Sequence, residues 1–440
     1  MKNIIIIAFI NLIAIYEGVA QTSMSLQEAI DYAMQNNPEI ANARLDILDA
    51  DAQVTQSKAI GLPKVDGSLE YNHYPQVPQQ ALPDAFALAF MLPPDQANEV
   101  SFLSQNNFTV GISASSLAFD GTYFTGLKAA RVLKDFTQLE LVAKEREVQN
   151  QVMDAYLPSL LIVETEKTLA KNIANLEKIL FETKEIYKAG FAEQLDVDRL
   201  ELSLANLATE QEALIQQKEI AINALKFVLA YPYDQELNLE DNIESLLAEA
   251  YDNKLTDEIN YQNRPEIKVV EKGLILDELN IERFERGFWP SLSVFGAYQY
   301  QYQGDDLNTG FWAPTFLLGA RVNVPIFDGF ETRAQKDRAT VALKQDTNRK
   351  KILESLITLE VKNARKQYLL AKDRLQSQEK NLALAEKIHK TTQIKYKEGV
   401  GSSLEVSQSE QSLYQTQQNR IQAMFDLLRA KVALDQALGY

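Results

Sequence analysis

The chain of 440 residues carries 61 acidic and 44 basic side chains, a net charge of −17, with two histidines and no cysteine. This acidic balance argues against nucleic acid as a partner, because phosphate binding requires clustered basic surface. Without cysteine we expect neither a disulfide framework nor an acylated N-terminal cysteine. We find no Cys/His cluster, phosphate-binding glycine loop or nucleophile elbow, so we expect no enzyme, no cofactor and no metal site.

Residues 1–20 have the pattern of a signal peptide. Lys2 supplies a positive start, Ile4–Ile15 form an apolar run, and Glu17–Ala20 follow as an exit rich in small residues. An N-terminal membrane anchor is the alternative, but the run is shorter than the roughly 20 residues that a spanning helix needs. No later stretch is apolar for that length, so we expect no transmembrane helix in the mature chain.

Short motifs of one half of the chain recur in the same order in the other half. The pairs are Asn37–Ile40 with Arg264–Ile267, Leu62-Pro63 with Trp289-Pro290, Phe119-Asp120-Gly121 with Phe327-Asp328-Gly329, Gly190 with Gly399, and Leu229 with Leu438. The first two pairs are 227 residues apart and the others 208 or 209, because the first copy has 19 extra residues between Pro63 and Phe119. Matches in the same order at such regular spacing indicate an internal duplication. We therefore expect a first structural repeat over 21–230, an equatorial or linker segment over 231–263 and a second repeat over 264–440.

The positions of glycine and proline predict very long helices. Neither residue occurs from Phe330 to Glu398, and Pro158 is the only one between Leu127 and Ala189. We expect Pro158 to kink its helix or to mark a joint. A four-and-three spacing that is typical of a coiled-coil seam runs through Leu169, Ile173, Leu176, Leu180, Thr183 and Tyr187. The expected long helices are 122–187, 193–230, 330–397 and 403–438.

A period of two replaces the helical period before each Phe-Asp-Gly motif. Leu69 and Tyr71, for example, alternate with Glu70 and Asn72. The strands expected from this pattern are about 63–74, 107–117, 291–303 and 314–325. The alternation is typical of a half-buried sheet on a soluble core, but the strand length also suits a tilted membrane strand. Because four strands are too few for a barrel, the membrane interpretation requires a homo-oligomer with a composite barrel.

Each Phe-Asp-Gly motif stands where a strand should become a helix. Asp120 and Asp328 are placed to cap the following helices, and Gly121 and Gly329 should relax the backbone at the corner. We interpret both corners, including Phe119 and Phe327, as structural features without a catalytic role. Pro63 and Pro290 should end the preceding helices, 41–60 and 268–284, before a strand begins.

This order of motifs over essentially the whole mature chain resembles the TolC-like outer-membrane efflux protein family. The resemblance implies a fold that is mainly α with a small β part. In that family a homotrimer forms a 12-stranded outer-membrane β-barrel, which a periplasmic α-helical barrel continues. It implies a channel that exports solutes or proteins from an inner-membrane pump and a periplasmic adaptor protein, set in outer-membrane lipid. The segment 231–263 would belong to an equatorial girdle around the tunnel.

The resemblance also assigns roles to the glycine turns, which in this family form the periplasmic tip. It implies an adaptor docking surface formed by Gly190-Phe191-Ala192 and Gly399-Val400-Gly401. Asp196 and Tyr396 match the gate pair, and Glu405 matches an acidic ring at the entrance; the chain departs from the family at Gly401 and Gln408. A carboxylate repeated at a constriction favours cations. The alternative is that Asp196 and Glu405 only cap the following helices.

We expect His389 to be solvated on a charged helix face and His73 to lie near the far end of a strand, in an interface belt or loop; neither should bind metal. The stretch 75–106 should be an extracellular loop, with Ala85–Leu92 as a short helix or plug. The competing functions are a secreted coiled-coil structural or adhesive protein without pore activity, and a periplasmic adaptor.

Overall fold

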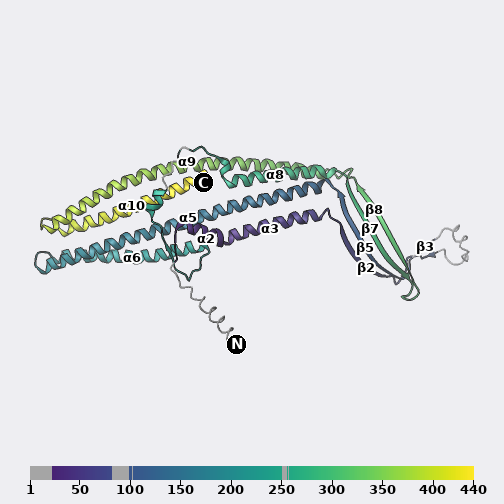
Figure 1. Cartoon of the computed structure of the whole chain (residues 1–440), viewed down its shortest axis with the longest axis horizontal. Helices are drawn as coiled ribbons and strands as arrows, with labels where there is room; N and C mark the ends of the chain where they lie inside the picture. Colours follow the sequence, from purple (N-terminus) through teal and green to yellow (C-terminus); the bar gives the residue numbers. More distant parts are fainter. Residues whose placement is uncertain (1–21, 82–98, 102, 250–254, 256) are drawn as a thin grey trace, which may run out of the picture. The chain divides into compact units, whose positions relative to one another are not determined.

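The computed structural model describes residues 22–81, 99–101, 103–249, 255 and 257–440. The expected signal peptide and the expected element over Ala85–Leu92 lie outside these residues. The chain forms two compact units. Of the described residues, those in 22–46, 137–271 and 348–440 form the helical unit, and those in 47–136 and 272–347 form the strand unit (Figure 1). The fold is mainly α with a small β part, as the sequence predicts.

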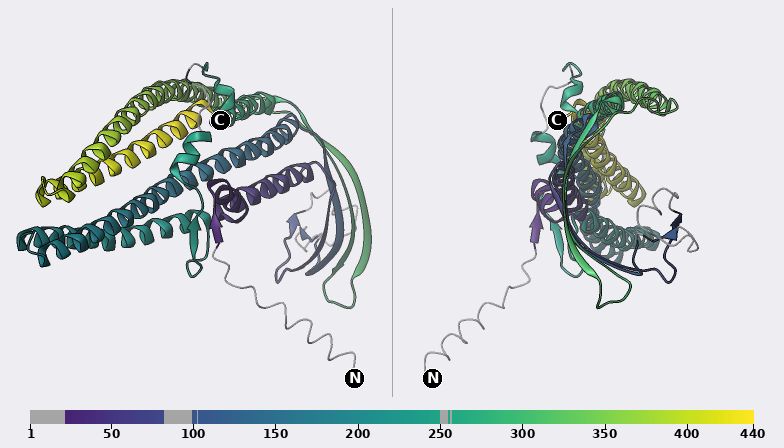
Figure 2. Two further views of the ribbon diagram at one scale, coloured as in Figure 1. Left: turned by 60° about the vertical axis from the view of Figure 1, so that its left-hand side comes forward. Right: turned by 90° about the vertical axis from the view of Figure 1, so that its right-hand side faces the viewer.

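The strand unit contains one four-stranded antiparallel sheet. Its strands, in the order in which they pair, are β2 (Lys64–His73), β5 (Asn106–Phe119), β7 (Ser291–Gly304) and β8 (Phe311–Asn323). The central pair, β5 and β7, joins the two repeats. Within the described part of the chain β2 and β8 each have a single partner, and the sheet curves without closing (Figure 2). Beyond β2, β3 (Gln80–Ala81) pairs with β4 (Glu99–Val100).

Helices flank each pair of strands in the chain. Before the strands come α3 (Pro38–Ala59) in the first repeat, and α8 (Pro265–Glu285) with the short η3 (Arg286–Phe288) in the second. After them come α5 (Gly121–Lys188) with α6 (Gln194–Leu229), and α9 (Glu331–Lys397) with α10 (Ser403–Leu438). Pro38 and Pro265 each occupy the first helical position, where a missing N–H costs no hydrogen bond.

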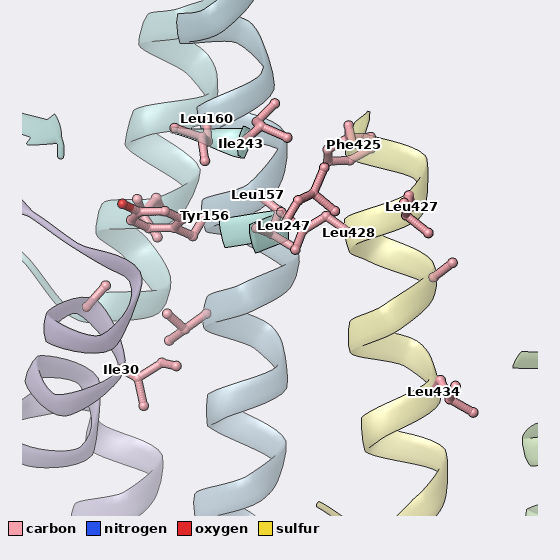
Figure 3. Close-up of a cluster of buried hydrophobic side chains, with 14 of the residues drawn as sticks. Ile30, Tyr156, Leu157, Leu160, Ile243, Leu247, Phe425, Leu427, Leu428 and Leu434 are labelled. Carbon is pink, nitrogen blue, oxygen red and sulfur yellow. The ribbon is translucent and has the colours of Figure 1, made fainter. Parts of the chain in front are cut away.

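Helix α5 runs through Pro158 without ending, so the expectation of a joint there is wrong. A proline inside a helix costs about 3 kcal/mol. Packing outweighs that cost, because Tyr156, Leu157 and Leu160 on either side of the proline are all buried. These residues belong to the main hydrophobic core, in which α5 and α10 contribute Leu160 and Leu428 (Figure 3).

The start of the first repeat and the linker segment 231–263 complete the helical unit. The strand β1 (Thr22–Met24) pairs in parallel with β6 (Leu237–Leu239), a contact that the sequence pattern did not predict. Helices α2 (Leu26–Asn36) and α7 (Ile243–Glu249) and the turn η2 (Tyr261–Asn263) follow these strands. Ser25 and Glu28 form a capping box at the start of α2. That Ser-x-x-Glu spacing is the sequence signal by which α2 could have been found.

Candidate functional site

One face of the four-stranded sheet carries a row of aromatic side chains. Tyr71, Phe108, Tyr302 and Trp312 are directly paired across all four strands. The Trp312 ring lies 5.9 Å from the Phe108 ring, edge-on, and 5.1 Å from the Tyr300 ring, stacked. This aromatic row therefore forms a continuous band at the end of the sheet that is remote from the Phe-Asp-Gly corners.

The same face is apolar below the aromatic row and ends in a second aromatic group. The next residues on this face are Leu69, Val110, Tyr300 and Pro314, followed by Gly67, Ile112, Tyr298 and Phe316. Ile112 and Phe316 are 60% and 68% exposed. At the other end the rings of Phe119 and Trp289 stack at 6.4 Å. An exposed apolar band between two aromatic rows is typical of strands that cross an outer membrane.

The opposite face of the sheet is the more polar one, although Phe295 and Leu317 also lie on it. Ser68, Gly111, Gln299 and Thr315 form one cross-strand row on it. This division favours the membrane interpretation over a sheet that rests on a soluble core, because no core covers apolar side chains such as Ile112 and Phe316 among the described residues. Among the described residues, no helix has the length and apolar character needed to span a membrane.

Both Phe-Asp-Gly corners are closed by aspartate, as expected. Asp120 accepts hydrogen bonds from the backbone N–H groups of Thr122 at 2.7 Å and Tyr123 at 2.9 Å. Asp328 accepts from the backbone N–H groups of Phe330 at 3.1 Å and Thr332 at 2.9 Å. Hydrogen bonds from Thr332 hold the pKa of Asp328 below its ordinary value, with the larger effect from the Thr332 side chain and a smaller one from its backbone N–H. Each aspartate therefore satisfies backbone donors that the helix leaves unpaired.

The glycines of the two corners have different roles. Gly329 has φ +66°, and Phe330 after it has φ +68°, so the second corner needs a glycine to relax the backbone. Gly121 is the first residue of α5 and does not have a positive φ. The expectation that it relaxes the backbone at the first corner is therefore wrong. A Cβ atom at Gly121 would lie 3.1 Å from the carbonyl oxygen of Arg286, so glycine there permits close approach of two chain segments.

The two expected tip turns have matching backbones. Gly190 and Gly399 have φ +80° and +75°, and their N–H groups donate to the carbonyls of Tyr187 and Tyr396 at 2.9 and 3.0 Å. Such a left-handed glycine ends a helix by satisfying its last carbonyl groups. Beside these glycines, Phe191 is 86% exposed and Val400 is 78% exposed. Ala192 and Gly401 line the same hollow as the two glycines.

The residues of the expected gate pair do not bind each other in the described contacts. Asp196 instead accepts a hydrogen bond from Ser403 Oγ of the other hairpin, and one from the backbone N–H of Glu193 at 3.1 Å. Tyr396 Oη lies 3.2 Å from Thr183 Oγ1. The two hairpins are thus joined by two hydrogen bonds, Asp196–Ser403 and Thr183–Tyr396, in place of the single expected contact between Asp196 and Tyr396. We call these two hydrogen bonds the tip latch.

The sequence pattern does not predict the two partners in the tip latch. It indicates Thr183 only as a seam position and Ser403 only as the first residue of a helix. Both are buried at 0% and 4% exposure, and a buried hydroxyl that has to be hydrogen-bonded is the physical reason for their pairing. Tyr187, the last expected seam position, is instead 41% exposed.

Glu405 lies exposed in the first turn of α10, where its backbone N–H donates to Ser402 Oγ at 3.2 Å. A carboxylate in the first turn of a helix interacts favourably with the helix N-terminus, as the capping alternative expects. Because the side chain is exposed, the same carboxylate can also attract cations at the entrance. Behind the tip latch, α5, α6 and α10 share a small apolar cluster that includes Leu176, Leu200 and Val406.

The expectation that His389 is solvated is wrong, and His73 lies at the end of a strand, as expected. His389 is only 9% exposed, because α10 packs against the α9 face that carries it. Its Nδ1 lies 3.1 Å from Ser409 Oγ, and its Nε2 lies 2.8 Å from Glu410 Oε2. His73 is the last residue of β2, next to Asn106. Among the described residues, no cluster of three or more His, Cys, Asp or Glu side chains could hold a metal ion.

Comparisons with known proteins agree on one family and one fold. The family model for outer membrane efflux proteins matches residues 29–230 and 260–440. The pyoverdine export outer membrane protein OpmQ of Pseudomonas aeruginosa is 24% identical over 76% of this chain and 70% of its own length. The cation efflux system protein CusC of Escherichia coli O157:H7 is 23% identical over 93% of this chain and 85% of its own.

Two crystal structures show the same chain fold. CusC superposes with a TM-score of 0.76 at 19% identity, over 97% of this chain and 95% of that chain. The outer membrane protein VceC of Vibrio cholerae superposes with a TM-score of 0.69 at 17% identity, over 94% and 96%. At this identity the structural likeness establishes the fold. The family model identifies the class of protein, outer membrane efflux proteins. It leaves most of the linker segment 231–263 unmatched.

Proposed function

The chain belongs to the outer membrane efflux protein family, and from this premise we propose that three copies of it form a gated export channel. The family consists of outer-membrane transport channels and not of enzymes. It gives no support to a secreted coiled-coil scaffold. The observation that carries the proposal is the open sheet, whose apolar face is exposed and whose edge strands β2 and β8 lack a second partner in the described part of the chain.

The number of copies follows from the size of a barrel. Four strands do not close, and two copies would supply eight strands, a number whose interior is filled by side chains. Three copies supply twelve strands and leave a lumen. In that trimer β8 of one copy pairs with β2 of the next, and the polar row around Gln299 faces the lumen. The aromatic rows around Trp312 and Trp289 then lie at the two surfaces of the outer membrane, where such side chains are favoured.

The tip latch is the proposed closed state of the gate. Each of its two hydrogen bonds contributes about 0.5–1.5 kcal/mol net, so three copies hold the gate with several kcal/mol. A periplasmic adaptor that binds the exposed Phe191 and Val400 in the open arrangement shifts the population toward it. An inner-membrane pump then drives solutes or proteins through the channel, and Glu405 at the entrance favours cations.

Planar-bilayer recordings test this function. The combined change Thr183→Val and Ser403→Ala removes both latch hydrogen bonds while preserving size, and should raise single-channel conductance or open probability. The matched control is Thr209→Val with Ser355→Ala, two exposed hydroxyls that bond only to their own helices. A wild-type protein without conductance would disprove the channel. Equal conductance of wild type and latch variant would remove the latch from the gate.

A second pair of changes tests Asp196 and Tyr396, the residues of the expected gate pair. Asp196→Ala with Tyr396→Phe removes one partner from each latch hydrogen bond and should have the same effect as the hydroxyl variant. If the two pairs of changes act through the same latch, their combination should raise conductance no further than either pair alone.

A further inference from the structure

A small cavity lies between the two hairpins, behind the tip latch. Its volume is about 140 Å³, and residues from α5, α6 and α10 line it. Asn172 and Leu176 come from α5, Asn206 and Leu207 from α6, and Glu410 and Tyr414 from α10. The gate function described above uses none of these side chains.

Glu410 is the unusual residue in this cavity. Its side chain is 5% exposed, yet neither of its carboxylate oxygens accepts an aligned hydrogen bond from the described residues. His389 on α9 approaches Oε2 at 2.8 Å, which provides a charge contact when the ring is protonated. A buried carboxylate oxygen without a donor is costly, and Oε1 has neither a hydrogen bond nor an ion pair among the described residues. Glu410 therefore has unused capacity at Oε1 for a ligand that brings N–H donors and positive charge.

The other polar side chains that line the cavity are uncharged, and two of them, Asn172 and Tyr414, are oriented by hydrogen bonds. Asn172 uses its amide hydrogens on Thr168 O at 2.8 Å and Gln417 Oε1 at 2.9 Å, which leaves its Oδ1 as an acceptor. Tyr414 donates to Glu210 Oε1 at 2.7 Å, so that burial and this carboxylate raise the pKa of Tyr414 and keep the phenol neutral. Glu410 is thus the one charged group that lines this cavity.

We propose that this cavity binds a small primary alkylammonium ion, with Glu410 as its counter-ion. A carboxylate and an amide oxygen suit the three donors of an ammonium group. Leu176 and Leu207 provide apolar contact for a short alkyl chain. A cavity of about 150 Å³ holds benzene, so about six heavy atoms fit here. A divalent metal is disfavoured, because a single carboxylate does not supply the six or more oxygen ligands that such ions require.

The ligand would join helices of both hairpins. Its ammonium group would contact α10 through Glu410 and α5 through Asn172, and its chain would contact α6 through Leu207. Binding would therefore stabilise the packing of the two hairpins, and, if the proposed gate function holds, it would favour the closed tip.

Calorimetric titration of the full chain in detergent with n-butylammonium chloride tests the site. Wild type should bind, whereas Glu410→Gln, which keeps the shape but loses the charge, should bind about tenfold or more weakly. Glu212→Gln, at an exposed carboxylate on α6, is the matched control and should bind as wild type does. The neutral analogue n-butanol should not bind.

A second variant keeps the test decisive if Glu410→Gln does not fold. Ser203→Leu adds a side chain to the cavity wall on α6 and should abolish binding by filling the space. The proposal is overturned by the absence of heat with wild type at about 10 mM amine, by equal binding to Glu410→Gln or Ser203→Leu, or by equal binding of n-butanol. Conductance is recorded separately: a conducting channel without amine binding refutes only the cavity, and amine binding without conductance refutes only the channel.

Discussion

Asn37 donates a hydrogen bond from Nδ2 to the carbonyl oxygen of Val228 at 2.9 Å, and so joins the start of α3 to the end of α6. The second repeat has the same connection, because Arg264 Nη1 donates to the carbonyl oxygen of Ala437 at 3.1 Å at the end of α10. Asn37 corresponds to Arg264, and Val228 to Ala437, in the internal duplication. A different side chain therefore satisfies the same helix-end carbonyl in each repeat.

Replacing Asn37 by alanine should destabilise the protein by about 1–3 kcal/mol. The change leaves the half-buried Val228 carbonyl without its side-chain donor and removes the acceptor of the Glu39 N–H at 2.8 Å. Asn36→Ala is the control, because Asn36 is exposed and bonds only within α2. Thermal unfolding followed by circular dichroism measures both; equal melting temperatures of the two variants would contradict the prediction.

Tyr156→Phe should cost about 1–3 kcal/mol and should loosen the contact between β1 and β6. The Tyr156 hydroxyl, in a fully buried side chain, lies 3.0 Å from Met24 O and 2.9 Å from Asp241 Oδ2. Losing it leaves the buried Met24 carbonyl and the half-buried Asp241 carboxylate with fewer donors. Tyr233→Phe, at an exposed tyrosine, serves as the control. Hydrogen exchange of the β1 and β6 amides should accelerate in Tyr156→Phe alone.

The same tyrosine predicts a pH dependence. Burial, with a smaller contribution from Asp241, raises the pKa of Tyr156 above its ordinary value of about 10. A raised folded-state pKa gives stability that is complete below about pH 10 and is lost as the pH rises further, because the unfolded state ionises first. The melting temperature of wild type should thus exceed that of Tyr156→Phe by less at about pH 11 than at pH 8. A difference that stays constant would show that the phenol ionises equally in both states.

Glycine-to-alanine changes should act in opposite directions at different sites. Gly190→Ala or Gly399→Ala places a side chain at a left-handed backbone position and should cost about 1–2 kcal/mol. Gly126→Ala lies inside α5, where a Cβ meets no other atom within 4 Å, and should stabilise by about 0.5–1 kcal/mol. Melting temperatures of the three single variants check the signs. A stabilising change at either tip glycine would mean that the turns adopt another backbone.

Local patterns predict the long helices and the strands because each depends on near neighbours in the chain. Helix α9 follows from the absence of glycine and proline between Phe330 and Glu398, and β7 follows from the alternation of tyrosine and glutamine. The capping role of Asp120 and Asp328 is equally local, since each carboxylate bonds N–H groups within four residues. These features were predicted correctly.

Contacts between distant segments were predicted less well. The expectation for Pro158 is a kink or a joint, and the joint is wrong, because the cost of a proline is local whereas the packing that outweighs it comes from other helices. His389 was expected to be solvated because its neighbours in α9 are charged, but α10 covers it. The exchange of partners in the tip latch, from Asp196 with Tyr396 to Asp196 with Ser403, has the same origin.

The sequence by itself thus determined the duplicated plan, the two-faced strands and the positions of the tip turns, because repeat spacing, side-chain period and glycine placement are properties of the chain. Only the tertiary structure decided which hydroxyl meets which carboxylate at the tip, and that Glu410 lies buried beside a cavity. Such pairings depend on how helices from different repeats pack, and that packing depends on the free energy of many distant contacts together.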